Sequence, residues 1–185
     1  MRHKIKDIAK LQTGLFAKPE QAGNVTYLQV KHFDENGHLQ EALHPDLKAN
    51  KVTEKHLLKQ GDILFAAKGA KNFAAIYESH NPPAVASTSF FVIRLYQNGI
   101  LPAYLAWYLN HPTTMTFLKE QAIGSSIVSI SKTVLDELEI PVPSVEQQQA
   151  ILHIASLQQR ESWLYRKIEA LREQLIQQQI FNTLK

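Results

Sequence analysis

The sequence predicts an α/β fold of the α+β kind: a mixed, β-rich domain with short helices, followed by one long C-terminal helix. Three patterns carry this prediction. Strand-prone apolar segments separated by turn residues fill the first half of the chain, a helical period replaces them from Pro102 onward, and residues 145–184 contain neither glycine nor proline. We therefore divide the chain into a compact domain, 1–143, and a helical segment, 144–185.

Composition limits the classes of protein. The 185 residues are 44% hydrophobic, which is enough for a buried core, and they carry a formal net charge of +3 with a sequence pI near 9.0. The absence of cysteine excludes disulfides and thiolate metal sites. No apolar run approaches the ~20 residues of a membrane span. No signal-like apolar segment follows the charged N-terminus, so we expect a cytoplasmic protein.

Lysines gather in one region of the chain, with only Glu54 and Asp62 among them. Such a cluster permits contact with nucleic acid at a modest net charge. A solvated helix face that runs into a loop accounts for it as well, and this alternative stays open. The lysines are Lys48, Lys51, Lys55, Lys59, Lys68 and Lys71.

The first quarter of the chain predicts short elements. The segment Ile5–Leu15 is typical of a helical turn or a strand edge that ends at a glycine. Val25–Val30 is strand-prone, and Asn36-Gly37 is a turn signal, so we expect a hairpin here. Thr53–Leu58 follows as a brief helix with Thr53 as its N-cap.

A second hairpin and a long strand complete the β-rich half. Ile63–Ala67 is a continuous apolar run that predicts a buried strand, Lys68–Asn72 is a turn, and Phe73–Tyr77 begins the returning strand. After a proline turn, Ala84–Leu95 predicts one long strand because it is rich in β-branched and aromatic residues.

Short helices follow. Residues 103–110 have a helical period that His111-Pro112 should stop, and 113–122 form a second helix that ends near Gly124. A helical turn is expected at Thr133–Leu138. The chain should then be extended through Ile140-Pro141-Val142-Pro143, because proline disfavours the α region in the residue before it.

The last segment gives the clearest pattern, a helix from Val145 to about Leu184. Its apolar residues are spaced by three and four, as at the a and d positions of a coiled coil, with Glu161 as an interruption. A helix of roughly 37 residues would be about 55 Å long, so we expect most of this seam to face another helix. The alternative is a helix folded back on its own domain. The seam consists of Ile154, Leu157, Leu164, Ile168, Leu171 and Leu175.

The sequence contains no residue pattern typical of an active site or a metal site. None of the eight histidines forms an i, i+4 pair suited to a helical metal site, and no phosphate-binding loop or nucleophile elbow occurs. Asn81-Pro82-Pro83-Ala84 resembles the Asn/Asp-Pro-Pro-aromatic loop of adenine methyltransferases, but alanine leaves nothing to stack on a flipped base. We therefore expect no catalytic residue, no metal and no cofactor in this chain.

An ordered set of motifs resembles a known family. Gln60-Gly61-Asp62-Ile63-Leu64-Phe65 comes first, the stretch 124–135 follows, and Ile140-Pro141-Val142-Pro143 leads directly into Glu146-Gln147-Gln148. Their order and spacing resemble the target-recognition domain of type I restriction–modification specificity subunits. A full subunit has two such domains and two long helices, whereas this chain has one of each. It therefore resembles a half-subunit, a natural short form or a fragment.

The resemblance implies a function and a set of sites. The domain would read double-stranded DNA, with lysines on phosphates and polar side chains on base edges. The helix would pair with a second copy or a second half-subunit. It would also dock methyltransferase subunits, which would carry the S-adenosylmethionine, and a restriction subunit would join the complete complex. The candidate DNA contacts are Gln12, Thr13, Lys31, Lys68, Gly69, Lys71, Asn72, Gly124, Ser125, Ser126, Ser131 and Lys132.

Two other functions remain open. The chain could be a stand-alone regulator that binds DNA as a coiled-coil dimer. Co-purification with a methyltransferase subunit would distinguish a specificity subunit from such a regulator. It could also be a protein-interaction scaffold. Salt-sensitive binding to a random-sequence duplex would exclude that class.

Overall fold

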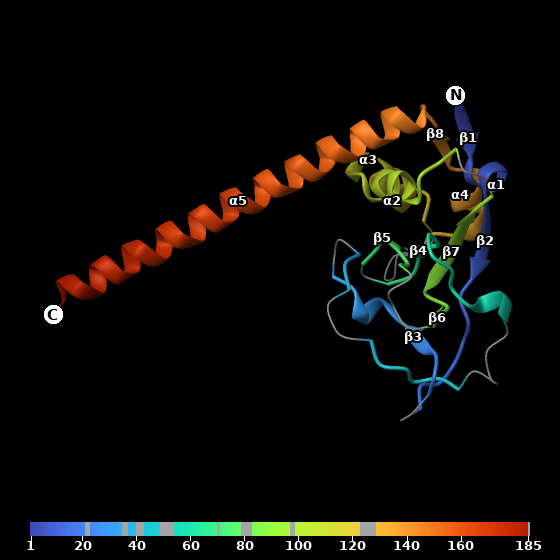
Figure 1. Cartoon of the computed structure of the whole chain (residues 1–185), viewed down its shortest axis with the longest axis horizontal. Coiled ribbons are helices and arrows are strands. Elements are labelled where there is room, and N and C mark those ends of the chain that lie inside the picture. The colour runs from blue at the N-terminus through green and yellow to red at the C-terminus, as the bar shows by residue number, and fades with distance from the viewer. Residues whose placement is uncertain are drawn as a thin grey trace. The chain divides into compact units, whose positions relative to one another are not determined.

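A computed structural model describes residues 1–20, 23–34, 37–39, 43–48, 54–69, 71–78, 83–96, 99–122 and 129–184. The chain divides into two compact units, Met1–Val145 and Glu146–Lys185. We call the first unit the head. It combines sheets with short helices, and one long helix makes up nearly all of the second unit, so the predicted fold class is confirmed (Figure 1).

A four-stranded antiparallel sheet forms the centre of the head. Its strands are β2 (Ala9–Thr13), β7 (Phe90–Leu95), β4 (Ile63–Ala66) and β5 (Ala74–Ile76), and they lie in that order. All four residues of β4 are buried, as expected from its continuous apolar run. β4 and β5 form the predicted hairpin.

The predicted hairpin after Val25 is wrong. Strand β3 (Thr26–Leu28) pairs in parallel with β6 (Ala84–Ala86). Among the described residues around the expected turn, Phe33 forms an isolated antiparallel bridge with Leu39, and the N–H of Asp34 donates to the carbonyl of His38. Every residue of β3 and of β6 is buried. Strands that are buried on both faces are typical of parallel pairing, whereas a hairpin at the surface usually exposes one face to water. β3 and β6 also satisfy each other's backbone hydrogen bonds. Asn36 lies outside the described residues.

The predicted long strand 84–95 is interrupted. β6 ends at Ala86, a turn occupies 87–89, and β7 starts at Phe90, because the two halves pair in different sheets. A third pair joins the ends of the head, since β1 (Arg2–Lys4) lies antiparallel to β8 (Glu139–Pro141).

The helices of the head are short. α1 (Ile5–Ile8) leads directly into β2, so the ambiguous first stretch contains both a helical turn and a strand. α2 (Pro102–Asn110), α3 (Pro112–Glu120) and α4 (Lys132–Glu137) confirm the predicted helices within one or two residues. Two single turns of 3-10 helix are η1 (Val30–His32) and η3 (Glu54–His56). The predicted cap of the latter, Thr53, lies outside the described residues.

A buried ion pair ties β4 to β7. Asp62, 1% exposed, immediately precedes β4 and accepts hydrogen bonds from the Nε and Nη2 atoms of Arg94 on β7, at 2.7 and 2.5 Å. The backbone N–H of Lys59 also donates to Asp62, and Arg94 donates to the carbonyl of Leu57. Gly61 precedes Asp62 with φ of +85°, a conformation that favours glycine. The Gly-Asp pair therefore shapes the turn and anchors the strand.

The second unit contains helix α5 (Val145–Thr183), 39 residues long, as predicted. Glycine and proline are absent, and nothing in the segment interrupts the backbone ladder. At 1.5 Å per residue its length is about 58 Å. Among the described residues, no helix combines the length and apolar character that crossing a membrane requires.

Candidate nucleic-acid interface

Several predicted contact residues share one end of the central sheet. β2 and β4 both lie antiparallel to β7, so they run in the same direction and finish at the same end. In register, Thr13 of β2 and Phe65 of β4 both lie opposite Phe91, and the next residue, Ala66, lies opposite Phe90. The segment after Thr13 and the turn after Ala66 therefore leave the sheet together.

The turn after β4 meets the segment that precedes α4. Lys68 forms an antiparallel bridge with Ser129, and the N–H of Ile130 donates to the carbonyl of Ala67 at 3.0 Å. Ser131 and Lys132 follow immediately, so the fold brings two predicted contact regions together that are about sixty positions apart in the sequence. Lys68 is exposed, and Gly69 adopts φ of +121° with open space around it.

Lys31 belongs to the same end of the sheet through an aromatic cluster. Its neighbour Phe33 packs on Phe73 and Phe90, with ring centroids 5.4 and 5.6 Å away. Phe73 begins the return from the β4–β5 turn, and Phe90 begins β7. These contacts hold η1, which carries the exposed Lys31, against the end of the sheet.

Three of the predicted base readers form hydrogen bonds within the protein. The Asn72 amide donates to the carbonyl of Ala66 at 2.9 Å and so closes the β4–β5 turn. Ser131 is the N-cap of α4, and its Oγ accepts from the N–H of Val134 at 3.2 Å. The Gln12 amide donates to the carbonyl of Lys55 at 3.0 Å, close to the surface. Thr13 and Lys71 are exposed.

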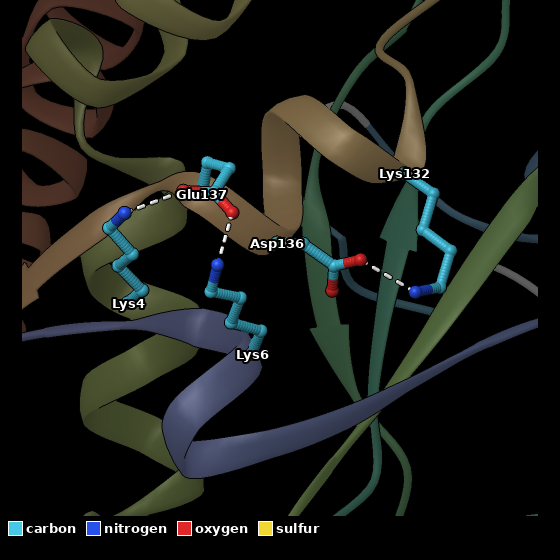
Figure 2. Close-up of polar contacts among 5 residues, drawn as sticks. All are labelled: Lys4, Lys6, Lys132, Asp136 and Glu137. Atoms are coloured by element: carbon cyan, nitrogen blue, oxygen red, sulfur yellow. Dashed lines mark hydrogen bonds and ion pairs between the residues drawn. The ribbon is translucent and has the colours of Figure 1, made fainter.

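Some of the positive charge on the head is paired. Figure 2 shows Lys132 bonded to Asp136, one turn further along α4, at 2.6 Å. It also shows Lys4 and Lys6 converging on Glu137, at 2.7 and 2.5 Å. Hydrogen bonds from Lys4 and Lys6 lower the pKa of Glu137 from 4.5 to about 2, and Glu137 raises the pKa of Lys4. A phosphate that binds Lys132 would compete with Asp136.

The remaining predicted contacts cannot be placed. Gly124, Ser125 and Ser126 lie outside the described residues, as does Lys51 of the lysine cluster. Within the part of the chain that the structure describes, no three histidine or carboxylate side chains gather as metal ligands would.

The apolar seam of α5 is exposed. Its side chains have exposed fractions between 45% for Leu164 and 57% for Ile154. Apolar side chains in a regular stripe along a helix are typical of a surface that pairs with another helix.

Fold and surface thus define a class of protein: an α+β head with lysines and polar turns at one end of its sheet, and a long helix with an exposed apolar seam. Residues 2–169 match the family described as type I restriction modification DNA specificity domain. The chain belongs to this family, which confirms the resemblance of its motifs.

Individual relatives agree with this assignment. The chain is 31% identical over 117 residues to the putative type I restriction enzyme MjaX specificity subunit of Methanocaldococcus jannaschii, an alignment that covers 60% of this chain and 27% of the relative. The chain is also similar to a solved structure described as "structural basis underlying complex assembly and conformational transition of the type I R-M system". The TM-score is 0.67 at 16% sequence identity, and the match covers 90% of this chain and 40% of the other. The HsdS subunit from Thermoanaerobacter tengcongensis gives 0.64 at 15% identity, over 90% and 39%.

The two structures, at such low identity, are similar in fold alone. This chain spans well under half the length of these relatives.

Proposed function

We propose that this chain is a non-catalytic, sequence-specific DNA-binding module that directs methyltransferase subunits, and in the complete complex a restriction subunit, to a bipartite target. The single observation that supports it most is the family match over residues 2–169. In this proposal residues 1–143 read the DNA, and residues 144–185 pair with another helix and dock the methyltransferase subunits. A protein with this task would act in the cytoplasm, where the DNA is.

The end of the sheet has the chemistry that this task needs. Exposed lysines such as Lys31 and Lys68 suit phosphate oxygens, and Gln12 and Thr13 suit base edges. Gln12 and Thr13 end strand β2, Lys31 lies on η1, which aromatic packing holds, and Lys68 lies in the turn that Asn72 closes. Little ordering of the backbone would therefore be needed on binding. The chain itself would carry no cofactor, and the partner methyltransferase would supply S-adenosylmethionine.

The α5 seam supports a dimer. Two copies paired through Leu164, Ile168 and their neighbours would be related by a two-fold axis. Their heads would then read two identical half-sites in opposite orientation, with the helices fixing the spacer.

Fluorescence anisotropy with a random-sequence duplex tests the DNA-binding part. Affinity should fall steeply as salt rises, because binding releases counterions. The double variant Lys31→Ala/Lys68→Ala should reduce the slope of log affinity against log salt by roughly 2, about 0.9 per lost phosphate contact. Lys119→Ala, an exposed lysine on α3, is the matched control and should leave the slope unchanged. An affinity for duplex DNA that does not change with salt concentration would refute the proposal and favour a protein scaffold.

Sedimentation tests the pairing. The wild type should sediment as a dimer at micromolar concentration, and Leu164→Glu/Ile168→Glu should be monomeric, because charges on the seam would be desolvated in the paired state. Ser162→Glu, an exposed position outside the seam, should leave the dimer intact. A wild type that stays monomeric with DNA present would exclude the homodimer. Failure to co-purify a methyltransferase subunit would favour a stand-alone regulator.

A further inference from the structure

Phe16 is an exposed aromatic side chain on a rigid backbone. It is 74% exposed and lies three residues beyond Thr13, where β2 leaves the sheet. The N–H of Gly14 donates to the carbonyl of Phe90, and the N–H of Leu15 donates to the carbonyl of Ala86. The chain therefore stays bonded to the head up to the residue before Phe16.

The backbone is also held on the other side of Phe16. The buried Tyr27 places its hydroxyl between the two neighbours of Phe16: it donates to the carbonyl of Leu15 at 2.9 Å and accepts from the N–H of Ala17 at 3.3 Å. A Cβ at Gly14 would collide with the carbonyl oxygen of Ser87, so this approach of the two segments requires glycine. Phe16 therefore stands on a backbone that is fixed before any ligand arrives.

Few large apolar side chains are exposed in the part of the head that the structure describes. Among the described residues of the head, the other exposed large apolar side chains are Met1, Tyr96 and Phe117. Tyr96 follows β7, which runs opposite to β2, so it lies at the other end of the sheet. Beside Phe16 in sequence are the exposed Thr13 and Lys18. An exposed ring with a polar and a positive side chain close to it in the sequence suits a nucleic-acid surface, whereas a protein partner usually covers a contiguous apolar patch.

We propose that Phe16 makes an apolar contact with the bases of duplex DNA and contributes to target specificity. This inference rests on the proposed DNA-binding function. Phenylalanine contacts thymine methyl groups in the major groove or enters between base steps as a wedge, and either contact depends on which bases are present. A fixed backbone restricts the ring to the positions that its side-chain rotamers can reach, so little backbone freedom is lost when it meets a base.

The test compares two kinds of duplex. Repeated selection from a random-sequence duplex library with the full chain yields its preferred site, and anisotropy then gives affinities for that site and for random duplex. Phe16→Ala should bind the preferred site roughly tenfold more weakly, the scale of losing one aromatic–base contact. Its affinity for random duplex should stay within about twofold, because the lysines that dominate non-specific binding are intact. Tyr96→Ala, 60% exposed at the opposite end of the sheet, is the matched control and should match the wild type for both.

Two further variants protect the test. Phe16→Tyr should retain the preference, and Phe16→Gln should lose it even if the alanine variant folds poorly; thermal melting checks each fold. Equal affinity of wild type and Phe16→Ala for the selected site would overturn the role of Phe16 while leaving DNA binding intact. A wild type that does not bind DNA would overturn both. Unchanged DNA binding with lost methyltransferase co-purification would assign Phe16 to a protein interface and also overturn the inference.

Discussion

Removal of the Arg94 guanidinium should destabilise the head strongly. In Arg94→Met the carboxylate of Asp62, 1% exposed, would keep the N–H of Lys59 and lose two charge-assisted hydrogen bonds. Removal of one partner of a buried ion pair lowers the free energy of unfolding by roughly 3–5 kcal/mol. The Arg94 side chain is 31% exposed, so water partly solvates this pair and we take the lower end, about 3 kcal/mol.

A double variant separates the charge from the packing. Asp62→Leu/Arg94→Met removes both charges, and it leaves the N–H of Lys59 without its acceptor and the carbonyl of Leu57 without its donor from Arg94. Each group left unsatisfied costs about 1–3 kcal/mol where it is buried. The double variant should therefore be more stable than the sum of the two single variants predicts. Replacement of a buried ion pair by apolar side chains is often close to neutral.

Urea and thermal unfolding measure the effect. Trp107 lies on α2 and Trp163 on α5, so a Trp163→Phe background leaves one tryptophan that reports on the head. At about 2–4 °C per kcal/mol for a domain of this size, Arg94→Met should melt roughly 6–12 °C lower. A loss under about 1 kcal/mol, below the scale for a buried pair, would refute this account of the anchor.

Three smaller predictions follow from local geometry. Gly14→Ala should cost roughly 1–3 kcal/mol in unfolding experiments, because its Cβ would overlap the Ser87 carbonyl oxygen. Gly99→Ala is the control and should be tolerated, because a Cβ added there would meet no atom within 4 Å. Glu137→Gln should be less stable than wild type above pH 4.5. The pKa of Glu137 is about 2 in the folded chain and 4.5 in the unfolded chain. Its ionised form therefore adds its full stability above pH 4.5, and the difference between the two proteins should vanish as the pH falls toward 2. Ser131→Ala removes the N-cap of α4 and should cost about 1 kcal/mol by thermal melting.

The features predicted well from the sequence were those encoded by neighbouring residues. The β4–β5 hairpin follows from two apolar runs around Lys68–Asn72, and α5 follows from 39 residues without glycine or proline. The pairing of β3 with β6 joins segments more than fifty residues apart, and no local pattern specifies it. Local turn signals at Asn36-Gly37 predicted a hairpin, but burial on both faces of β3 required a different partner.

The candidate site was predicted less well, because side-chain roles depend on tertiary neighbours. Ser131 and Asn72 were predicted as base readers, and the fold uses both to satisfy backbone groups. Phe16 has no signal in the sequence, because a single apolar residue in a loop shows no periodicity. The backbone around it is held by the Tyr27 hydroxyl and by the close approach of Gly14 to Ser87, and these are tertiary contacts that no local pattern specifies.

The motifs that identify the family lie mainly on the framework. Gly61 and Asp62 shape and anchor β4, Ile140 is buried in β8, and Ser131 caps α4. Other candidate contacts at the sheet end lie outside these motifs, namely Thr13, Lys31 and Lys68. Two classes of variant should therefore separate experimentally. Substitutions in the motifs should lower the free energy of unfolding and reduce affinity for all DNA sequences in proportion to the folded fraction. Substitutions at the contacts should change DNA affinity or preference at unchanged stability.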